Sequence, residues 1–197
     1  MVEASRRRAI EDVASDLFRE RGYAATSVRD IARALSMQGP SLYAHVTSKE
    51  DVLWAIVERA AGRFEAAADD AERRAEEGRA GDPVEAITEL VRAHVKVVTD
   101  DVGEASVFVH EWRALGPGRR DVVLARRDAY EGRFRRRIEV GISTGAFVMT
   151  DPAIASTVIL TALNGVAGWY DPEGRLPADR VADHLVDLVL RSLSCEA

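Results

Sequence analysis

The sequence has almost none of the residues that build disulfide frameworks, metal clusters or membrane spans. Its 197 residues include one cysteine, Cys195, so neither a disulfide framework nor a multi-thiolate zinc site is expected. No continuous apolar run reaches the roughly 18 residues that a membrane-spanning helix needs, and the charged N-terminus is unlike a signal peptide. We therefore expect a cytoplasmic protein with no membrane partner.

Catalytic motifs are scarce as well. His45, His94, His110 and His184 are scattered along the chain, and the sequence contains no HExxH string, no P-loop and no cysteine cluster. His110 and Glu111 are adjacent, and neighbouring side chains on a helix point apart. We expect no enzymatic activity, no metal ion and no cofactor.

The charge is modest and unevenly distributed. The net charge of -6, from 27 bases and 33 acids, argues against a protein that coats nucleic acid through bulk charge. Residues 1–50 hold eight bases and seven acids, so this part carries +1 and the remainder carries -7. The triplet Arg6–Arg8 is either a contact to a DNA backbone or minor groove, or a solvated tail. A local DNA-binding surface is therefore compatible with the charge.

Proline and glycine interrupt segments whose apolar residues recur at helical spacing, and no alternating, strand-like segment competes with them. Ser27 with Asp30, and Ser48 with Asp51, form capping boxes at two of the helix starts. The pattern predicts an all-α protein of about nine helices. The predicted helices cover residues 2–21, 27–35, 40–46, 48–77, 83–100, 105–115, 119–140, 151 to at least 163, and 177–193.

The most informative feature is the pair of short helices over 27–35 and 40–46. Two such helices joined by a short turn can place the second helix in the major groove of DNA. At the DNA backbone we expect phosphate contacts from Ser27, Arg29, Tyr43 and Lys49. At the base edges we expect Gln38, Ser41 and His45, with small Gly39 and Ala44 permitting a close approach. Alternatively, the helix pair is ordinary packing and the serines are only caps.

Three strings carry a family resemblance: TSVRDIA over 26–32, SLYAHV over 41–46 and KEDVL over 49–53. Together they closely resemble the DNA-binding domain of TetR-family transcriptional regulators, over about residues 6–54. The resemblance implies a three-helix DNA-binding head, residues 1–50, and a helical ligand-binding and dimerisation body, residues 51–197, linked by the helix that begins near 48. It further implies a dimeric repressor that binds a palindromic operator and is released by a small molecule.

The resemblance also assigns roles by position. It puts phosphate contacts at Thr26, Ser27, Tyr43 and Lys49, and a recognition helix at Gln38, Gly39, Pro40, Ser41 and His45. Two positions depart from the family pattern. Ser36 stands where the family usually has the turn glycine, which predicts either a strained left-handed residue or a slightly different turn. Val46 replaces a common phenylalanine, which removes some core volume.

The body contains an arginine-rich segment, residues 119–137, with eight arginines and three acids. It is either a solvated helix face or a site for an anionic ligand group, because arginine matches phosphate and carboxylate geometry. The strings over 110–113, 130–135 and 164–174 resemble the TetR branch that includes sensors of acyl-coenzyme A thioesters. We therefore consider a small hydrophobic or acyl-CoA-type effector. The candidate ligand residues, each of which is otherwise a core or surface residue, are Phe108, Trp112, Arg113, Arg133, Phe134 and Asn164.

The last two helices are the candidate interface of a homodimer. The family resemblance places a four-helix dimer interface there, and the small residues Ala162, Gly165 and Gly168 would let helices approach closely. The final helix has a broad apolar face, formed by Leu185, Leu188, Val189 and Leu193. The rival function is a helical protein-interaction module that has no specific DNA binding.

Overall fold

The computed structural model describes residues 2–148 and 150–194, without the side chains of residues 2–5, 39 and 40; Cys195 lies outside the described residues. These residues form nine α-helices and one short 3-10 helix, with no strand among them. The all-α prediction is confirmed. The chain packs as two compact units, residues 1–61 with 101–125 and residues 62–100 with 126–197. The division into residues 1–50 and 51–197, which follows the family resemblance, stays a prediction.

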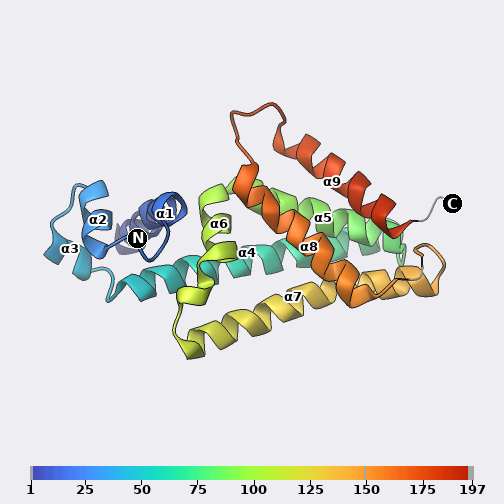
Figure 1. Ribbon diagram of the computed structural model, residues 1–197, viewed down its shortest axis with the longest axis horizontal. Coiled ribbons are helices and arrows are strands. Elements are labelled where there is room, and N and C mark those ends of the chain that lie inside the picture. Colours follow the sequence, from blue (N-terminus) through green and yellow to red (C-terminus); the bar gives the residue numbers. More distant parts are fainter. Residues whose placement is uncertain (1, 149, 195–197) are drawn as a thin grey trace. The chain divides into compact units, whose positions relative to one another are not determined.

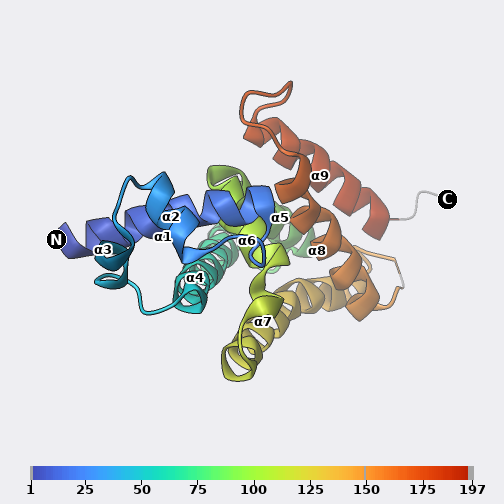
Figure 2. The same cartoon turned by 60° about the vertical axis from the view of Figure 1, so that its left-hand side comes forward.

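Unit 1 is built around the N-terminal helices. α1 packs against α2 and α6, and α2 packs against α3 (Figure 2). Its fully buried side chains include Ile10, Phe18, Ile31, Leu42 and Leu53, so every one of the first four helices contributes an apolar residue to one core. The elements of unit 1 are α1 (Val2–Arg21), α2 (Val28–Ala34), α3 (Gly39–Tyr43), the start of α4 (Lys49–Glu77), α6 (Val102–His110), η1 (Trp112–Ala114) and the start of α7 (Pro117–Ser143).

A cluster of charges crosses this unit. Arg59 of α4 pairs with the buried carboxylate of Glu104 on α6 at 2.6 Å, and with Glu11 and Asp12 on α1. A buried carboxylate is costly unless it is paired and hydrogen-bonded, and here the arginine meets that need. Arg59 therefore ties three helices of unit 1 together.

Unit 2 contains the rest of α4 and α7 together with α5 (Pro83–Asp100), α8 (Pro152–Trp169) and α9 (Ala178–Leu193). Within it, α5 packs against both α8 and α9 (Figure 1). By length and composition alone α8 could cross a membrane, a test that buried core helices of soluble proteins also pass. Only 28% of α8 is buried, so it is not such a core helix. Its exposed apolar surface therefore needs an explanation.

Two glycines do not break helices as the sequence suggested. α6 begins at Val102, three residues earlier than predicted, because the Asp101 side chain accepts a hydrogen bond from the Glu104 N–H at 2.9 Å and caps the helix ahead of Gly103. α7 runs through Gly141, whereas Gly145, at φ +76°, follows its end. A Cβ at position 141 would overlap the Phe147 ring, so this glycine provides room for packing.

The turn between α2 and α3 contains the predicted strained residue. Ser36 has a φ of +53°, the left-handed conformation. The N–H of Met37 donates to the Ala32 carbonyl at 2.8 Å and the N–H of Ser36 donates to the Arg33 carbonyl at 3.0 Å, as in a Schellman motif. After the turn, α3 ends at Tyr43, earlier than the predicted Val46, because the Leu42 carbonyl accepts from both His45 and Val46 in a closing turn.

We expect Ser36→Gly to raise the free energy of unfolding by about 1 kcal/mol, because glycine adopts a positive φ without the clash of a Cβ. Urea unfolding followed by circular dichroism measures this. The control Ala34→Gly, at the last residue of α2, should instead lower the free energy, by less than about 1 kcal/mol. A destabilising Ser36→Gly would show that the serine side chain contributes more than its strain costs.

Candidate nucleic-acid interface and effector site

The start of α2 is shaped by its capping box. The Asp30 N–H donates to Ser27 Oγ at 3.2 Å, and Asp30 Oδ2 accepts from the Ser27 N–H at 2.9 Å. Hydrogen bonds from Ser27 lower the pKa of Asp30. Ser27 and Arg29 are both exposed, as a phosphate contact requires.

Thr26 and Lys49, both predicted phosphate contacts, have structural roles that the sequence did not show. Thr26 is only 2% exposed, and its hydroxyl donates to the Gly22 carbonyl at 2.9 Å, at the end of α1. Lys49 Nζ donates to the carbonyls of Tyr23 and Thr26, each at 2.8 Å, and lies 4.1 Å from the Tyr23 ring centroid. Both side chains thereby fix the loop between α1 and α2. Their contact with phosphate stays a prediction.

The predicted base-reading residues lie on and beside α3. Gln38 is the N-cap of α3, its side chain makes no capping bond, and it is exposed together with Ser41. Tyr43, at the end of the helix, is 56% exposed. His45 is half-buried and lies in the turn after α3, so its predicted place on the recognition helix is wrong, since the helix ends two residues earlier.

Gly39 and Pro40 form the first turn of α3, although their side chains lie outside the described ones. A proline at this point leaves no hydrogen bond unmade, because the first N–H groups of a helix have no partner within it.

The six candidate ligand residues divide between the two units. Phe108 and Trp112 are buried in unit 1, where the guanidinium of Arg113 stacks on Trp112 at 4.5 Å from the ring centroid. In unit 2, Phe134 is fully buried and Asn164 is half-buried. These contacts give Phe108, Trp112 and Phe134 a place in the core, which the sequence kept open as the alternative.

Three arginines of α7 in unit 2, Arg126, Arg133 and Arg137, pair with acids of α4. Arg126 forms a two-pronged pair with Glu65, with both contacts at 2.7 Å. Arg133 pairs with Asp69 at 2.6 Å and with Glu72 at 2.9 Å. Neither arginine is a bare cation, so holding an anionic ligand would mean giving up an existing ion pair.

An aromatic cluster in unit 2 includes a histidine that was not among the candidate ligand residues. His94 of α5 is 2% exposed, and its ring centroid lies 4.8 Å from that of Phe64 on α4. Its Nδ1 lies 3.2 Å from the hydroxyl of Tyr130 on α7, and the Tyr130 ring packs against Phe134. Burial, helped by the positive charge of Arg127, lowers the pKa of His94 to about 3. The ring is therefore neutral at physiological pH.

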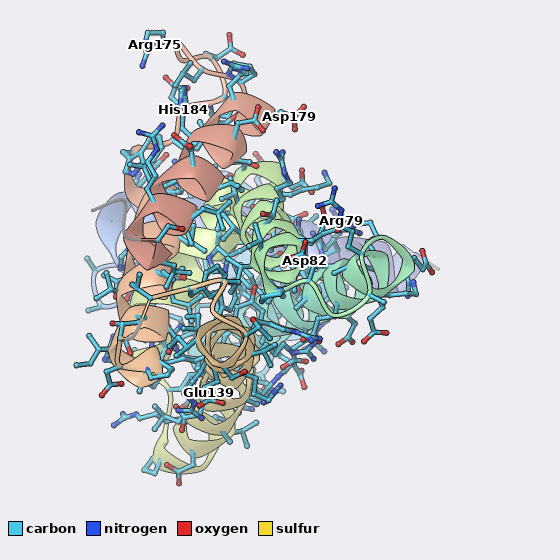
Figure 3. The ribbon with its side chains drawn as sticks, turned by 90° about the vertical axis from the view of Figure 1, so that its right-hand side faces the viewer. Arg79, Asp82, Glu139, Arg175, Asp179 and His184 are labelled. Carbon is cyan, nitrogen blue, oxygen red and sulfur yellow. The ribbon has the colours of Figure 1, made fainter. Side chains whose placement is uncertain are left out.

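A pocket of about 230 Å³ lies elsewhere in unit 2, and six of the ten residues that line it are charged. The carboxylate of Glu89 pairs with Arg74 at 2.7 Å, and Lys96 pairs with Asp100 at 2.9 Å. Figure 3 shows Asp179, which also lines it, at the start of α9. The pocket does not suit a hydrophobic effector, since its lining consists mainly of charged side chains: Arg74, Glu89, Arg92, Ala93, Lys96, Thr99, Asp100, Ala178, Asp179 and Ala182.

One string, Gly141–Gly145, has the GxSxG spacing of hydrolase nucleophiles. Its serine, Ser143, is the last residue of α7, and its hydroxyl donates to the Val140 carbonyl at 2.8 Å. A nucleophile elbow requires a strand before the serine and a helix after it, and the described residues contain no strand. Within the same residues, no group of three or more His, Cys, Asp or Glu could hold a metal ion.

Comparison with known families places the chain. Residues 10–56 match the family described as "Bacterial regulatory proteins, tetR family", and residues 80–193 match "Tetracyclin repressor-like, C-terminal domain". The chain belongs to the TetR family. It is a transcriptional regulator with the helix-turn-helix of that family, formed here by α2 and α3.

Several TetR-family proteins are similar over nearly the whole chain. The repressor KstR2 of Rhodococcus jostii is 26% identical, with 98% of this chain and 93% of that protein covered. The structure of PfmR from Thermus thermophilus has 33% identity and a TM-score of 0.82, and the match covers 95% and 99% of the two chains. The structure of AibR in complex with isovaleryl coenzyme A and operator DNA has 28% identity and a TM-score of 0.80, covering 93% and 97%.

For this TetR-family head we expect Lys49→Met to lower the free energy of unfolding by about 1.5 to 3 kcal/mol, because two carbonyls lose a charged donor. Thermal and urea unfolding measure the change. The control Arg29→Met removes an exposed cation and should change the free energy by less than about 0.5 kcal/mol. Unchanged stability in Lys49→Met would contradict the structural role of its bonds to the two carbonyls.

Proposed function

We propose that this TetR-family protein is a repressor, which binds a palindromic operator as a homodimer and dissociates from it when a small molecule binds to the body. The observation that carries the proposal is the exposed polar surface of α2 and α3, in which Ser27, Gln38, Ser41 and Tyr43 are available while the apolar side chains beneath them are buried. The relatives support it, since KstR2 is named a repressor and AibR was solved with operator DNA.

The division of labour on DNA follows from the chemistry of the exposed groups. Arg29 and Tyr43 would donate to phosphates and fix the position of the head on the duplex. Ser27, whose hydroxyl donates to Asp30 Oδ2 at 2.5 Å, would have to turn from that carboxylate to do the same. Gln38 and Ser41 would reach base edges, because a glutamine amide can form a paired contact with adenine. Two heads related by a twofold axis would contact half-sites about 34 to 36 Å apart, which makes the operator palindromic.

The homodimer would form through α8 and α9. Ile154 and Val158 of α8 are 63% and 61% exposed, and Leu188 of α9 is 61% exposed. Ala162 and Gly165 lie on α8 one and two turns beyond Val158 and are exposed too. A stripe of exposed apolar and small residues along a helix is unusual for a monomer and suits a helix-packed interface.

The effector would be a small hydrophobic molecule or an acyl-CoA thioester. The support is the complex of AibR with isovaleryl coenzyme A, together with the aromatic composition of the core of unit 2. We further propose that the protein acts in the cytoplasm and by binding alone, without catalysis. The relatives that support this are regulators of transcription.

A helical protein-interaction module is the second candidate, and the apolar stripe of α8 is the observation that favours it. The two functions differ in what α3 does, because only the repressor needs a sequence-specific contact there. Electrophoretic mobility shifts against DNA upstream of the gene separate them: a salt-sensitive, sequence-specific shift supports the repressor, and no shift across several candidate operators contradicts it.

On such an operator, Tyr43→Ala should weaken binding about tenfold for every sequence variant, since it removes a phosphate contact. Gln38→Ala should instead relax the preference at one base pair, by roughly tenfold or more. The control Arg180→Ala, on α9, should leave both affinity and preference unchanged. Equal losses on all operator variants would contradict the base-reading role of Gln38.

We expect Val158→Asp to weaken dimerisation by roughly 100-fold, because each copy would bury an unpaired carboxylate in the interface. Analytical ultracentrifugation over a concentration series measures it. Val140→Asp is the matched control, since that valine is also an exposed apolar residue, on α7. A dimer that survives Val158→Asp would place the interface elsewhere.

A further inference from the structure

The core of unit 2 contains a polar atom without a protein partner. His94 Nε2 is buried and has no hydrogen bond, whereas Nδ1 of the same ring is 3.2 Å from the Tyr130 hydroxyl. More than nine-tenths of buried polar groups are hydrogen-bonded, so an orphaned imidazole nitrogen in a core needs an explanation. His94 lies on α5 and contacts Phe64 of α4 and Tyr130 of α7.

The contact with Tyr130 determines what the free nitrogen offers. A phenol is a good donor and an imidazole nitrogen a good acceptor, so the Tyr130 hydroxyl is best placed donating to Nδ1. A neutral ring then carries its proton on Nε2, because a neutral imidazole has one donor and one acceptor. His94 thus presents an N–H donor in aromatic surroundings. Its natural complement is an acceptor oxygen.

The surroundings of His94 also favour an uncharged acceptor over an anionic one. A carboxylate buried among aromatic rings needs a counter-ion, yet Arg133 is paired with Asp69 and Glu72. Arg127, whose positive charge helps to lower the pKa of His94, is likewise engaged in an interaction within the protein. A carbonyl oxygen needs only the one hydrogen bond that Nε2 can give.

We propose that His94, positioned by Tyr130, is the polar contact of the effector site and donates a hydrogen bond to an uncharged carbonyl oxygen, such as that of an acyl thioester, whose chain packs against Phe64 and Phe134. The proposal rests on the proposed function, since it names the atom by which the effector is recognised. In this proposal the acyl end of the ligand is held by a neutral N–H donor and not by an arginine. Tyr130 acts as a positioning residue, because it fixes the tautomer of His94.

Two coenzyme A compounds test the proposal on the full-length protein: isovaleryl-CoA, a thioester, and S-isopentyl-CoA, a thioether of the same carbon skeleton that lacks the carbonyl oxygen. Isothermal titration calorimetry should show the wild-type protein binding the thioester about tenfold more tightly. His94→Phe should abolish this preference, and His94→Gln, which keeps an N–H donor, should restore part of it. Tyr130→Phe should reduce the preference by freeing the ring. His184→Phe, the same exchange at an exposed position of α9, should leave it intact.

The stability of the ligand-free variants provides a readout that a structural histidine would not give. His94→Phe should melt within a few degrees of the wild-type protein, because removing the unsatisfied Nε2 offsets the hydrogen bond that the Tyr130 hydroxyl loses. A melting temperature several degrees lower, or a preference that survives both His94 variants, would overturn the proposal. Equal binding of both compounds by the wild type would overturn only the carbonyl contact. If the wild type bound neither compound, the acyl-CoA part of the proposed function would fail, and the contact with it.

Discussion

The DNA-facing surface depends on how the loop between α1 and α2 is held. α3 has five residues, too few to be stable by themselves, so its position comes from the elements packed around it. The loop is fixed from both ends of the head: Thr26 bonds back to the Gly22 carbonyl, and Lys49 reaches from the start of α4 to the carbonyls of Tyr23 and Thr26. Lys49 thus has a structural role, although a cation at this place would be expected to contact phosphate.

Local signals in the sequence were enough to predict most of the fold. The capping box of Ser27 with Asp30, the cap that Ser48 provides for the Asp51 N–H and the stop at Gly22 each depend on residues within one turn of each other, and all three are present in the structure. The left-handed Ser36 was one of two outcomes expected from the family resemblance. The errors came where a distant residue decides the local structure. α7 continues through Gly141, where a side chain would overlap the Phe147 ring, and nothing in the local sequence indicates that the ring packs there.

The same distinction separates the two candidate sites. Exposure of Gln38, Ser41 and Tyr43 follows from a short amphipathic helix and could be anticipated. The partner of Lys49 could not, since it lies 23 and 26 residues away in the chain. His94 did leave a signal, because it is a polar residue within the apolar face of α5, between Val91 and Val98. A single buried histidine has no metal-ligand spacing, so motif patterns do not reveal it.

An unsatisfied donor in the core has a consequence for regulation. The ligand-free protein carries the cost of leaving His94 Nε2 unpaired, and a ligand that supplies an acceptor recovers it. Binding therefore gains the hydrogen bond and relieves the cost in one step, whereas a ligand of the same shape without the oxygen gains only apolar contact. Discrimination of this kind is strong because it depends on an unmet polar group and not on size. The neutral ring is needed for it, since a protonated His94 would select anions instead.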